Sequence, residues 1–372
     1  MELSFWEYRS WFTEVDYCIA GGGITGLSCA LELRRQQPGA RILVLERGSL
    51  PQGASTKNAG FACFGSLTEI LEDLESHTES EVAALVEQRY LGIRQLRDRL
   101  GDQALGYETR GGYEVFLDGE REQQEAALDR MEEVNALLRP VFGGAAFEIR
   151  PNTFGMQGID SRLVCQPYEG QIDTGRAMQQ LLSLVQREGI LLLHGLSVSS
   201  YEETGQGVEV HTADFSFTAR QLLLATNGLA GELASIDLKP ARAQVLITDP
   251  VPGLKLQGCF HLEAGYYYFR NVGNRVLLGG GRNLDKAGET TTTFGLTPLI
   301  QDRLETLLQE IILPGNPVGI ARRWSGIMGV GPQKKPIVER LSPHVCCGVR
   351  LGGMGVAIGS HVGARLARLA LD

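Results

Sequence analysis

The segment 16–46, DYCIAGGGITGLSCALELRRQQPGARILVLE, decides the fold. It predicts a strand over DYCIA, a tight turn at GGGITG and a helix over LSCALELRRQQ, followed by a break at Pro38-Gly39 and a second strand over RILVLE. Strand, helix and strand in this order form a βαβ unit, in which the two strands are parallel.

Three glycines in the turn give the pattern G-x-G-x-x-G. Gly21 permits the tight turn, Gly23 lets the backbone approach a pyrophosphate, and Gly26 lets the helix pack closely on the strand. Glu46 ends the second strand twenty residues after Gly26. Its carboxylate can accept hydrogen bonds from an adenosine ribose and repels a 2′-phosphate. The unit therefore predicts binding of FAD or NAD, and not of NADP.

Two further segments favour FAD over NAD. The other dense glycine run before the C-terminal region, Gly279 to Gly281, is followed by no helix-opening sequence, so one dinucleotide is predicted. RQLLLATNG (220–228) predicts a buried strand that ends in a turn, and the tail from 344 predicts a strand, a glycine turn and a helix from about Gly355. A helix N-terminus there would stabilise the charge that develops at N1 and O2 of a reduced flavin.

Composition excludes several classes of protein. The chain has 372 residues and 47 glycines without a triplet period, and 43% of its residues are hydrophobic, which indicates a globular protein of about two domains. Its net charge of −9 argues against a nucleic-acid partner bound through a broad basic face. Seven scattered cysteines without a CxxC pair predict neither a disulfide framework nor a metal site.

No apolar run is long enough to span a membrane and no secretion signal is apparent, so a soluble cytoplasmic protein is expected. The N-terminal aromatic residues Phe5, Trp6, Trp11 and Phe12 are expected to pack against the body of the protein; the alternative is an exposed, sticky arm.

The order of further motifs resembles the FAD-dependent oxidoreductases of the D-amino-acid oxidase family, which include glycine oxidase and sarcosine oxidase. These motifs are GGGITG with Glu46 and Arg47, GASTKNAGFA (53–62), GQIDTGRAMQQLL (170–182), ATNG (225–228), RRWSGIMGVGPQKKPIVERL (322–341) and GVRLGGMGVAIGS (348–360). The resemblance covers nearly the whole chain and implies a small-molecule substrate.

The expected fold class is α/β, with a Rossmann-like FAD-binding domain and a discontinuous α+β substrate domain that has a mainly antiparallel sheet. Helical spacing over 79–100 and 121–138, β-rich runs over 243–281 and a helix from Pro298 to about Ile312 supply the second domain. We assign 1–78, 165–235 and 335–372 to the FAD-binding domain, and 79–164 and 236–334 to the substrate domain.

The family motifs imply a set of cofactor-binding positions around the pyrophosphate, the adenine and the flavin ring. They are Gly21, Gly23, Ile24, Thr25, Gly26, Glu46, Arg47, Ser55, Thr56, Lys57, Asn58, Ala59, Gly60, Phe61, Val198, Thr226, Asn227, Gly326, Ile327, Gly352, Gly353, Met354, Gly355 and Val356.

Two departures from the sarcosine-oxidase pattern carry information. The cysteine that binds FAD covalently in that branch has its counterpart around Gly326, so FAD is expected to be non-covalent here. The lysine thought to activate oxygen is replaced by Leu277. The electron acceptor is therefore left open between O2 and an unidentified carrier.

Substrate contacts are expected on the YYYFR strand and on the strands of 322–330. Tyr267 matches a tyrosine that holds the substrate carboxylate in glycine-oxidase-like members, although Tyr266 and Tyr268 face the other way and the register is open. Arginines suit a carboxylate, and the candidates are Arg282, Arg323 and Arg350. No catalytic acid or base is assigned.

The leading functional hypothesis is an FAD-dependent oxidoreductase that takes hydride from the C–N bond of an amino acid or secondary amine to flavin N5, giving an imine that hydrolyses. The alternatives are oxidation of a 2-hydroxy acid, trimming of a carboxymethyl-amine on tRNA, and an FAD-binding sensor without turnover. The oligomeric state is left open.

Overall fold

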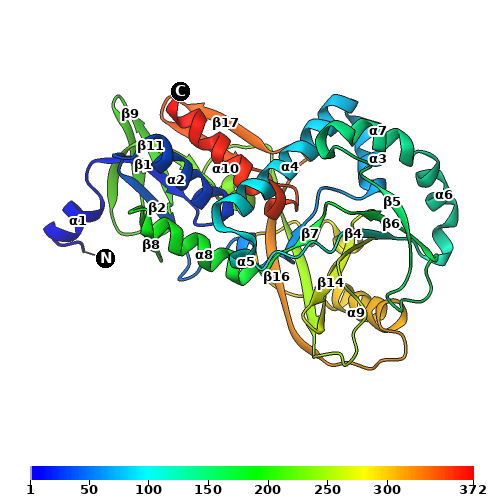
Figure 1. Cartoon of the computed structure of the whole chain (residues 1–372). Helices are drawn as coiled ribbons and strands as arrows, with labels where there is room; N and C mark the ends of the chain where they lie inside the picture. Colours follow the sequence, from blue (N-terminus) through cyan, green and yellow to red (C-terminus); the bar gives the residue numbers. More distant parts are fainter. Residues whose placement is uncertain (1) are drawn as a thin grey trace.

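The computed structural model describes residues 2–372 and contains two large sheets with helices packed around them (Figure 1). The first sheet has the order β17-β18-β11-β1-β2-β8, and β10 and β9 extend it from β11. Its strands are β1 Val15–Ala20, β2 Ile42–Glu46, β8 Leu191–His194, β9 Ser200–Thr204, β10 Gly207–His211, β11 Ser216–Leu224, β17 Ile337–Ser342 and β18 Val345–Val349.

The centre of this sheet is the predicted βαβ unit. Strand β1 pairs in parallel with β2 on one side and with β11 on the other, so that Ile19 faces Val44 and Leu223. Parallel strands bring their carboxyl ends to one edge, which is where ligands bind in open α/β sheets. The segments after β1, β2 and β11 therefore meet at the same edge.

Three helices cover one face of the first sheet: α2 Ile24–Gln36, α8 Thr174–Arg187 and α10 Gly355–Leu371. α10 lies between α2 and α4 Glu79–Leu100, and at Gly92 the backbones of α4 and α10 approach so closely that a Cβ would overlap the carbonyl oxygen of Ala357. The remaining helices are α1 Phe5–Trp11, α3 Leu67–Ser76, α5 Asp102–Leu105, α6 Arg121–Asp129, α7 Met131–Phe142 and α9 Pro298–Leu307.

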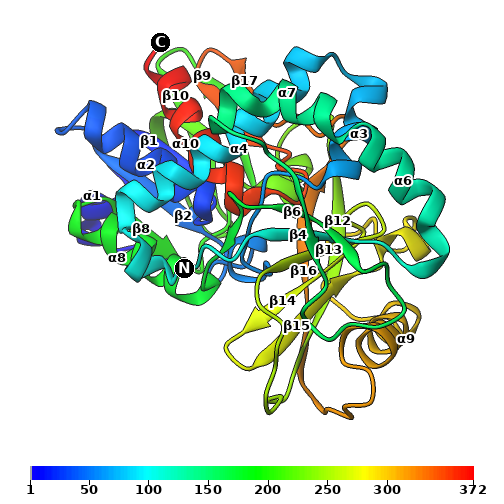
Figure 2. The ribbon, with the colours of Figure 1, turned by 45° about the vertical axis from the view of Figure 1, so that its right-hand side comes forward.

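The second sheet has the order β16-β12-β15-β14-β13-β4-β6-β5 and is antiparallel except where β13 meets β4. Its strands are β4 Gly112–Val115, β5 Glu148–Pro151, β6 Arg162–Gln166, β12 Lys239–Thr248, β13 Cys259–Leu262, β14 Tyr267–Val272, β15 Arg275–Gly280 and β16 Ile320–Val330. One face of this sheet packs on α9 (Figure 2). Phe260, Tyr267 and Phe269 are buried in the apolar core between them. A small sheet of β3 Phe61–Ala62 and β7 Gly170–Gln171 is separate.

The α/β fold class is confirmed, and three details differ from the expected organisation. The helix expected over 121–138 is two helices, α6 and α7. The boundary proposed at residue 165 falls inside β6, which belongs entirely to the second sheet, and α4 packs on α10 although it was assigned to the substrate domain. Contact between helices is non-local, so the sequence of α4 alone does not say which domain its apolar face covers.

The N-terminal helix α1 does not pack as expected. Its capping box is formed by Ser4 and Glu7, but none of its residues is buried, and Phe5 and Trp6 are 67% and 68% exposed. The helix projects from the body of the protein (Figure 1). Only Phe12, which follows it, is buried, against Phe215 and Phe217.

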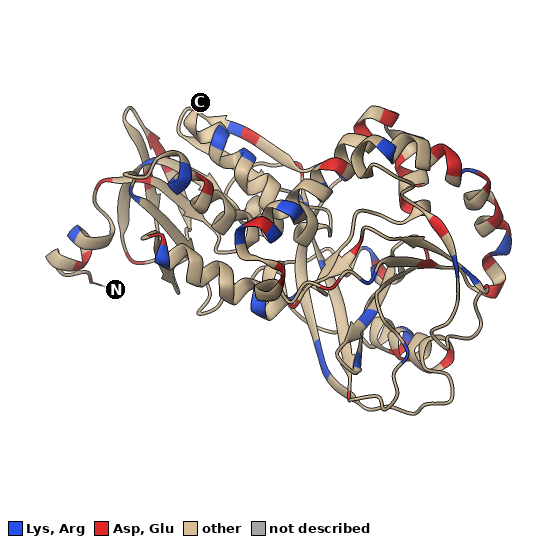
Figure 3. Ribbon diagram, viewed as in Figure 1, with Lys and Arg blue, Asp and Glu red and all other residues tan. Residues whose placement is uncertain are grey.

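Acidic and basic residues are interspersed along the outer helices (Figure 3). Among residues 2–372, none of the helices combines the length and the hydropathy that a membrane-spanning helix needs.

Candidate cofactor and active site

A cavity of about 470 Å³ lies where the two sheets meet. From the first sheet it is lined by the carboxyl ends of β1, β2 and β11 and by the start of α10. From the second sheet it is lined by Ala243 and Val245 of β12, His261 of β13, Tyr268 of β14, and Gly326 and Met328 of β16. The cavity is therefore built jointly by both sheets.

The N-terminus of α2 opens into this cavity. Its N-cap is Gly23, which supplies no side chain, and its first turn has no acidic residue. A Cβ at Gly26 would overlap the carbonyl oxygen of Gly21, so glycine is what allows α2 to follow β1 so closely. Ser55 Oγ accepts a hydrogen bond from Ile24 N at 2.9 Å. A helix N-terminus whose own N-cap residue makes no capping bond, and whose first turn carries no negative charge, suits a phosphate.

Glu46 is held rigidly at the end of β2. Its carboxylate accepts hydrogen bonds from the backbone N–H groups of Gly22 (3.0 Å), Gly48 (2.9 Å) and Gln52 (3.2 Å), and it lines the cavity. Arg47 and Val198 line the same region. A carboxylate fixed in this way fits a ribose better than a 2′-phosphate.

The N-terminus of α10 opens into the same cavity. Gly352 (φ +59°) and Gly353 (φ +83°) make the left-handed turn before it, its N-cap Met354 provides no capping bond, and its first turn has no acidic residue. In contrast, α1, α3, α4 and α8 all have side-chain N-caps. Two positive helix ends directed at one cavity fit a ligand with two sites of negative charge.

Two hydroxyls on the cavity wall strengthen this fit. The buried Oγ1 atoms of Thr25 and Thr226 have no hydrogen-bond partner among residues 2–372, although both residues line the cavity. Buried polar groups are normally satisfied, so a polar ligand is the natural partner. The donor set, with glycines where a ligand must approach closely, fits a flavin dinucleotide.

The segment over 53–61, which follows β2, runs along the second sheet. Gly53, Ala54, Ser55, Lys57, Asn58, Ala59 and Phe61 line the cavity. Asn58 Oδ1 accepts hydrogen bonds from Gly60 N and Thr174 Oγ1, both at 2.8 Å, and Trp324 Nε1 donates to the carbonyl of Lys57 at 2.9 Å. Burial lowers the pKa of Lys57.

Four expected cofactor positions do not line the cavity. Gly26 packs on Gly21, Thr56 donates to the carbonyl of Pro51 at 2.6 Å, and Gly60 sits against Ile172. Ile327 is buried on the other face of β16, since side chains alternate along a strand and its neighbours Gly326 and Met328 line the cavity. Every other expected cofactor position lines it.

Three of the four expected substrate residues lie elsewhere. Tyr267 is fully buried in the core on the α9 side of the second sheet, while Tyr266 and Tyr268 line the cavity. Arg323 donates to Gln301 (2.7 Å) and Glu305 (2.6 Å). Arg350 donates to the carbonyls of Lys335 (3.0 Å) and Asp237 (2.9 Å).

Arg282 is the exception, because it lines the cavity. It is half-buried, and no hydrogen bond or ion pair engages it within residues 2–372. Its guanidinium is therefore free to bind an anion there.

One set of polar side chains on the cavity wall is not among the residues expected from the sequence. Cys63, Glu69, His261 and Lys334 line the cavity, and Glu169 lies behind them, 1% exposed. His261 could have been found from alternation in CFHL, where Phe260 and Leu262 belong to the core and the residue between them must face the other way.

His261 is paired with Glu169. Its Nε2 lies 3.7 Å from Glu169 Oε2. Burial alone would lower the pKa of His261, but the Glu169 carboxylate, helped by Glu69 and Cys259, outweighs it and raises the pKa to about 9. Cys63, Glu169 and His261 have their polar atoms within 4.8 Å of one another, the one such group with metal-ligand chemistry within residues 2–372. Because Glu169 also accepts hydrogen bonds from the backbone N–H groups of Phe64 and Gly65, we interpret the contact between Glu169 and His261 as an ion pair.

Comparison with known proteins bears on what this cavity holds. A family model described as FAD dependent oxidoreductase (DAO) matches residues 16–369. The chain belongs to this family. FAD is therefore its cofactor, and the protein is an oxidoreductase.

Relatives within this FAD-dependent family span most of the chain. "Probable oxidoreductase OrdL" of Rhizobium meliloti is 26% identical over 96% of this chain and 83% of its own. Gamma-glutamylputrescine oxidoreductase of Escherichia coli is 24% identical over 94% of this chain and 82% of its own. The crystal structure of iminodiacetate oxidase from Chelativorans sp. BNC1 has the same fold, with a TM-score of 0.77, 19% identity and coverage of 95% of each chain.

Proposed function

We propose that the protein oxidises the C–N bond of an amino acid or secondary amine, with hydride passing to flavin N5 and the imine then hydrolysing. FAD, when bound, supplies the hydride acceptor. The observation that carries the proposal is the composite cavity. Its first-sheet side carries two uncapped helix ends, and its second-sheet side carries aromatic rings with Arg282 and His261.

The chain's own residues position the reactants in this scheme. When FAD is bound, the α2 N-terminus would hold the pyrophosphate, Glu46 would hold the ribose, and the α10 N-terminus would stabilise negative charge on the flavin ring. Tyr266 and Tyr268 replace Tyr267 as the tyrosines that contact substrate, and Arg282 attracts a carboxylate at the cavity wall. Most of the wall residues are half or fully buried, which favours the exclusion of water from the reacting carbon.

We propose that FAD is held without a covalent bond. Gly326 stands where a linking cysteine would be expected, and the cysteine that does line the cavity, Cys63, is fully buried, which raises the pKa of its thiol well above its usual value. A thiol that stays protonated is a poor nucleophile. Denaturation with acid should therefore release free FAD.

The comparisons support an amine substrate without naming it. Two similar proteins are a gamma-glutamylputrescine oxidoreductase and an iminodiacetate oxidase. A cytoplasmic location is also proposed, and it is supported by seven cysteines that are all buried and free.

The test is anaerobic reduction of the bound flavin by panels of amino acids, secondary amines and 2-hydroxy acids. Bleaching of the flavin absorbance by an amine is expected; bleaching by hydroxy acids alone would contradict the proposal in favour of the hydroxy-acid alternative, and no bleaching by any donor would favour the sensor. Admitting O2 afterwards and timing reoxidation separates an oxidase from a dehydrogenase. Slow reoxidation is expected, because Leu277 lies in an apolar cluster with Ala59 and Val245.

A further inference from the structure

His261 is a buried histidine on the wall of the cavity. Its side chain is 8% exposed, and it makes an edge-to-face contact with the Phe61 ring, with ring centroids 5.5 Å apart. On the second sheet His261 pairs with Tyr268 of β14, which also lines the cavity. Phe61 contacts both side chains, with its ring centroid 5.5 Å from that of His261 and 5.5 Å from that of Tyr268.

The partner of His261 is fixed independently of any ligand. Glu169 Oε1 accepts hydrogen bonds from Phe64 N at 2.6 Å and Gly65 N at 3.3 Å, so its carboxylate cannot swing away. The titratable groups that face His261 from the surrounding elements are Glu169, Cys259, Cys63, Glu69 and Tyr268. The Glu169 carboxylate lies 3.7 Å from His261 Nε2 and raises the pKa of the imidazole to about 9, which favours its charged form at neutral pH.

The other acid near His261 is already compensated. Glu69 Oε2 accepts a hydrogen bond from Ser66 N at 3.0 Å, and the positive charges of His261, Lys334 and Arg89 lower the pKa of its carboxyl group. Neither carboxylate forms a hydrogen bond with His261, whose buried Nε2 has no hydrogen-bond partner within residues 2–372.

We propose that His261, which lies beside Glu169 on the cavity wall, binds the carboxylate of the substrate inside the cavity. This rests on the proposed function and deepens it, because it assigns the substrate to amines that carry an anionic group. Arg282 is half-buried and follows the end of β15, so it has more freedom and more water around it than His261. A charge-assisted hydrogen bond from a buried, fixed donor contributes more than one from a partly solvated side chain.

The test uses the FAD-loaded enzyme and measures binding by the perturbation of the flavin spectrum. The probes are benzoate and the neutral, similarly shaped benzamide. For His261→Gln we expect benzoate to bind about 10- to 100-fold more weakly, the value of a charged hydrogen bond, with benzamide little changed. For Arg282→Gln we expect the affinity for benzoate to fall by less than about fivefold. His361→Gln, at a histidine on α10 that does not line the cavity, is the matched control and should bind both probes as the unaltered enzyme does.

A second measurement needs no substitution. Benzoate affinity of the unaltered enzyme should be level from pH 7 to 8 and should fall about tenfold per pH unit above the pKa of His261, which is about 9. Glu169→Gln should move this break to lower pH.

The inference is overturned if affinity shows no break up to pH 10, if benzoate and benzamide weaken equally in His261→Gln, or if Arg282→Gln alone abolishes benzoate binding. Amine-driven bleaching with a benzoate site that ignores His261 would defeat this inference and leave the proposed function standing. If benzoate binding depends on His261 but no amine bleaches the flavin, the proposed function fails and His261 remains the anion-binding residue.

Discussion

Neighbouring tyrosines on β14 have opposite surroundings. Tyr267 is in the core between the second sheet and α9, whereas the ring of Tyr268 lies across Gly279 and lines the cavity. Side chains alternate along a strand, so a shift of one residue exchanges core for cavity. In a run of three tyrosines the sequence contains no contrast of polarity that could settle this choice.

Replacement of each tyrosine by phenylalanine should separate these two roles. The buried hydroxyl of Tyr267 has no hydrogen-bond partner among residues 2–372, so Tyr267→Phe should change the free energy of unfolding by less than about 1 kcal/mol and leave KM unchanged. Tyr268→Phe should raise KM and perturb the flavin spectrum at similar stability. Urea unfolding and steady-state kinetics check both, and a KM effect confined to Tyr267→Phe would contradict the assignment.

The long arginine side chains show a second limit at the residue scale. Arg323 ends at Glu305 of α9, and Arg350 ends at Asp237 in the connection before β12. Each partner is close in space through the packing of a separate element. Residue type alone predicts that an arginine seeks an acceptor, and not which one.

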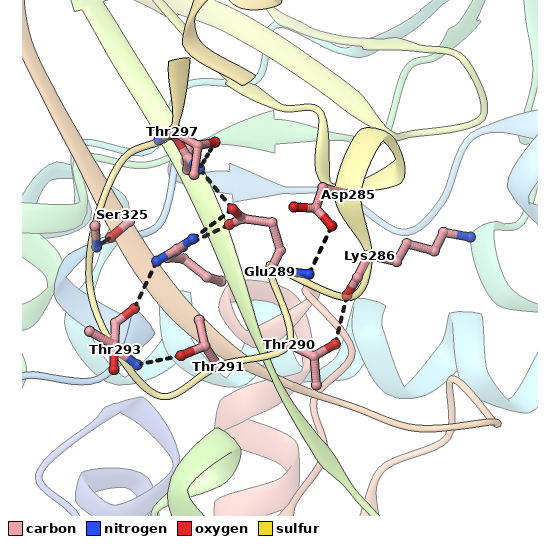
Figure 4. Close-up of polar contacts among 12 residues, drawn as sticks. Asp285, Lys286, Glu289, Thr290, Thr291, Thr293, Thr297 and Ser325 are labelled. Atoms are coloured by element: carbon pink, nitrogen blue, oxygen red, sulfur yellow. Dashed lines mark hydrogen bonds and ion pairs between the residues drawn. The ribbon is translucent and has the colours of Figure 1, made fainter. Parts of the chain in front are cut away.

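Among the elements, the connection from β15 to α9 illustrates how a loop is fixed (Figure 4). Glu289, which is fully buried, accepts hydrogen bonds from Arg242 Nε (2.8 Å), Arg242 Nη2 (2.7 Å) and Gln244 Nε2 (3.0 Å). Gln244 also donates to Thr297 at 2.9 Å. The anchored segment begins with Arg282 and includes Phe294, whose ring centroid lies 5.2 Å from Lys57 Nζ.

Glu289→Gln should loosen this connection. It leaves the guanidinium of Arg242, 11% exposed, without its counter-charge, which typically costs about 3–5 kcal/mol. The measurements are urea unfolding and hydrogen exchange over 282–297. Glu148→Gln is the control, since its exposed pair with Arg150 should contribute less than about 1 kcal/mol. Equal effects of the two substitutions would show that Glu289 does not anchor the loop.

Elements with a strong local signal were predicted well. The βαβ unit and the helix that starts at Pro298 are present, the latter as α9 followed by a π-helical turn over Leu308–Ile312. The anchor of the connection before α9 could not be predicted, because Glu289 and Arg242 are 47 residues apart in the chain. Only the pairing of β12 with β15 brings them together.

At the scale of the whole molecule, the cavity lies where the two large sheets meet. The first sheet supplies the unpaired hydroxyls of Thr25 and Thr226 and the two uncapped helix ends, and the second supplies Val245, Tyr268 and Met328. FAD bound in this cavity would contact both sheets at once. Its binding should therefore stabilise the whole chain.

Removal of FAD should lower the midpoint of thermal unfolding, and added FAD should restore it. At a free concentration of one thousand times Kd, the gain is about 4 kcal/mol. NADP should give no stabilisation, because Glu46 repels its 2′-phosphate. Calorimetry at several FAD concentrations is the measurement, and a midpoint independent of FAD would contradict the cavity as its site.

The sequence by itself determined the dinucleotide fingerprint, the α/β class and most of the proposed cofactor positions that line the cavity. These depend on local chemistry: a glycine where a Cβ would collide, a carboxylate at a strand end, and a helix that begins without an acid. The tertiary structure alone decided which tyrosines face the cavity, which arginine remains free, and that His261 and Glu169 form a buried ion pair. Those outcomes depend on the face of a strand and on partners from distant elements, and a partner's position is fixed only when the sheets pack.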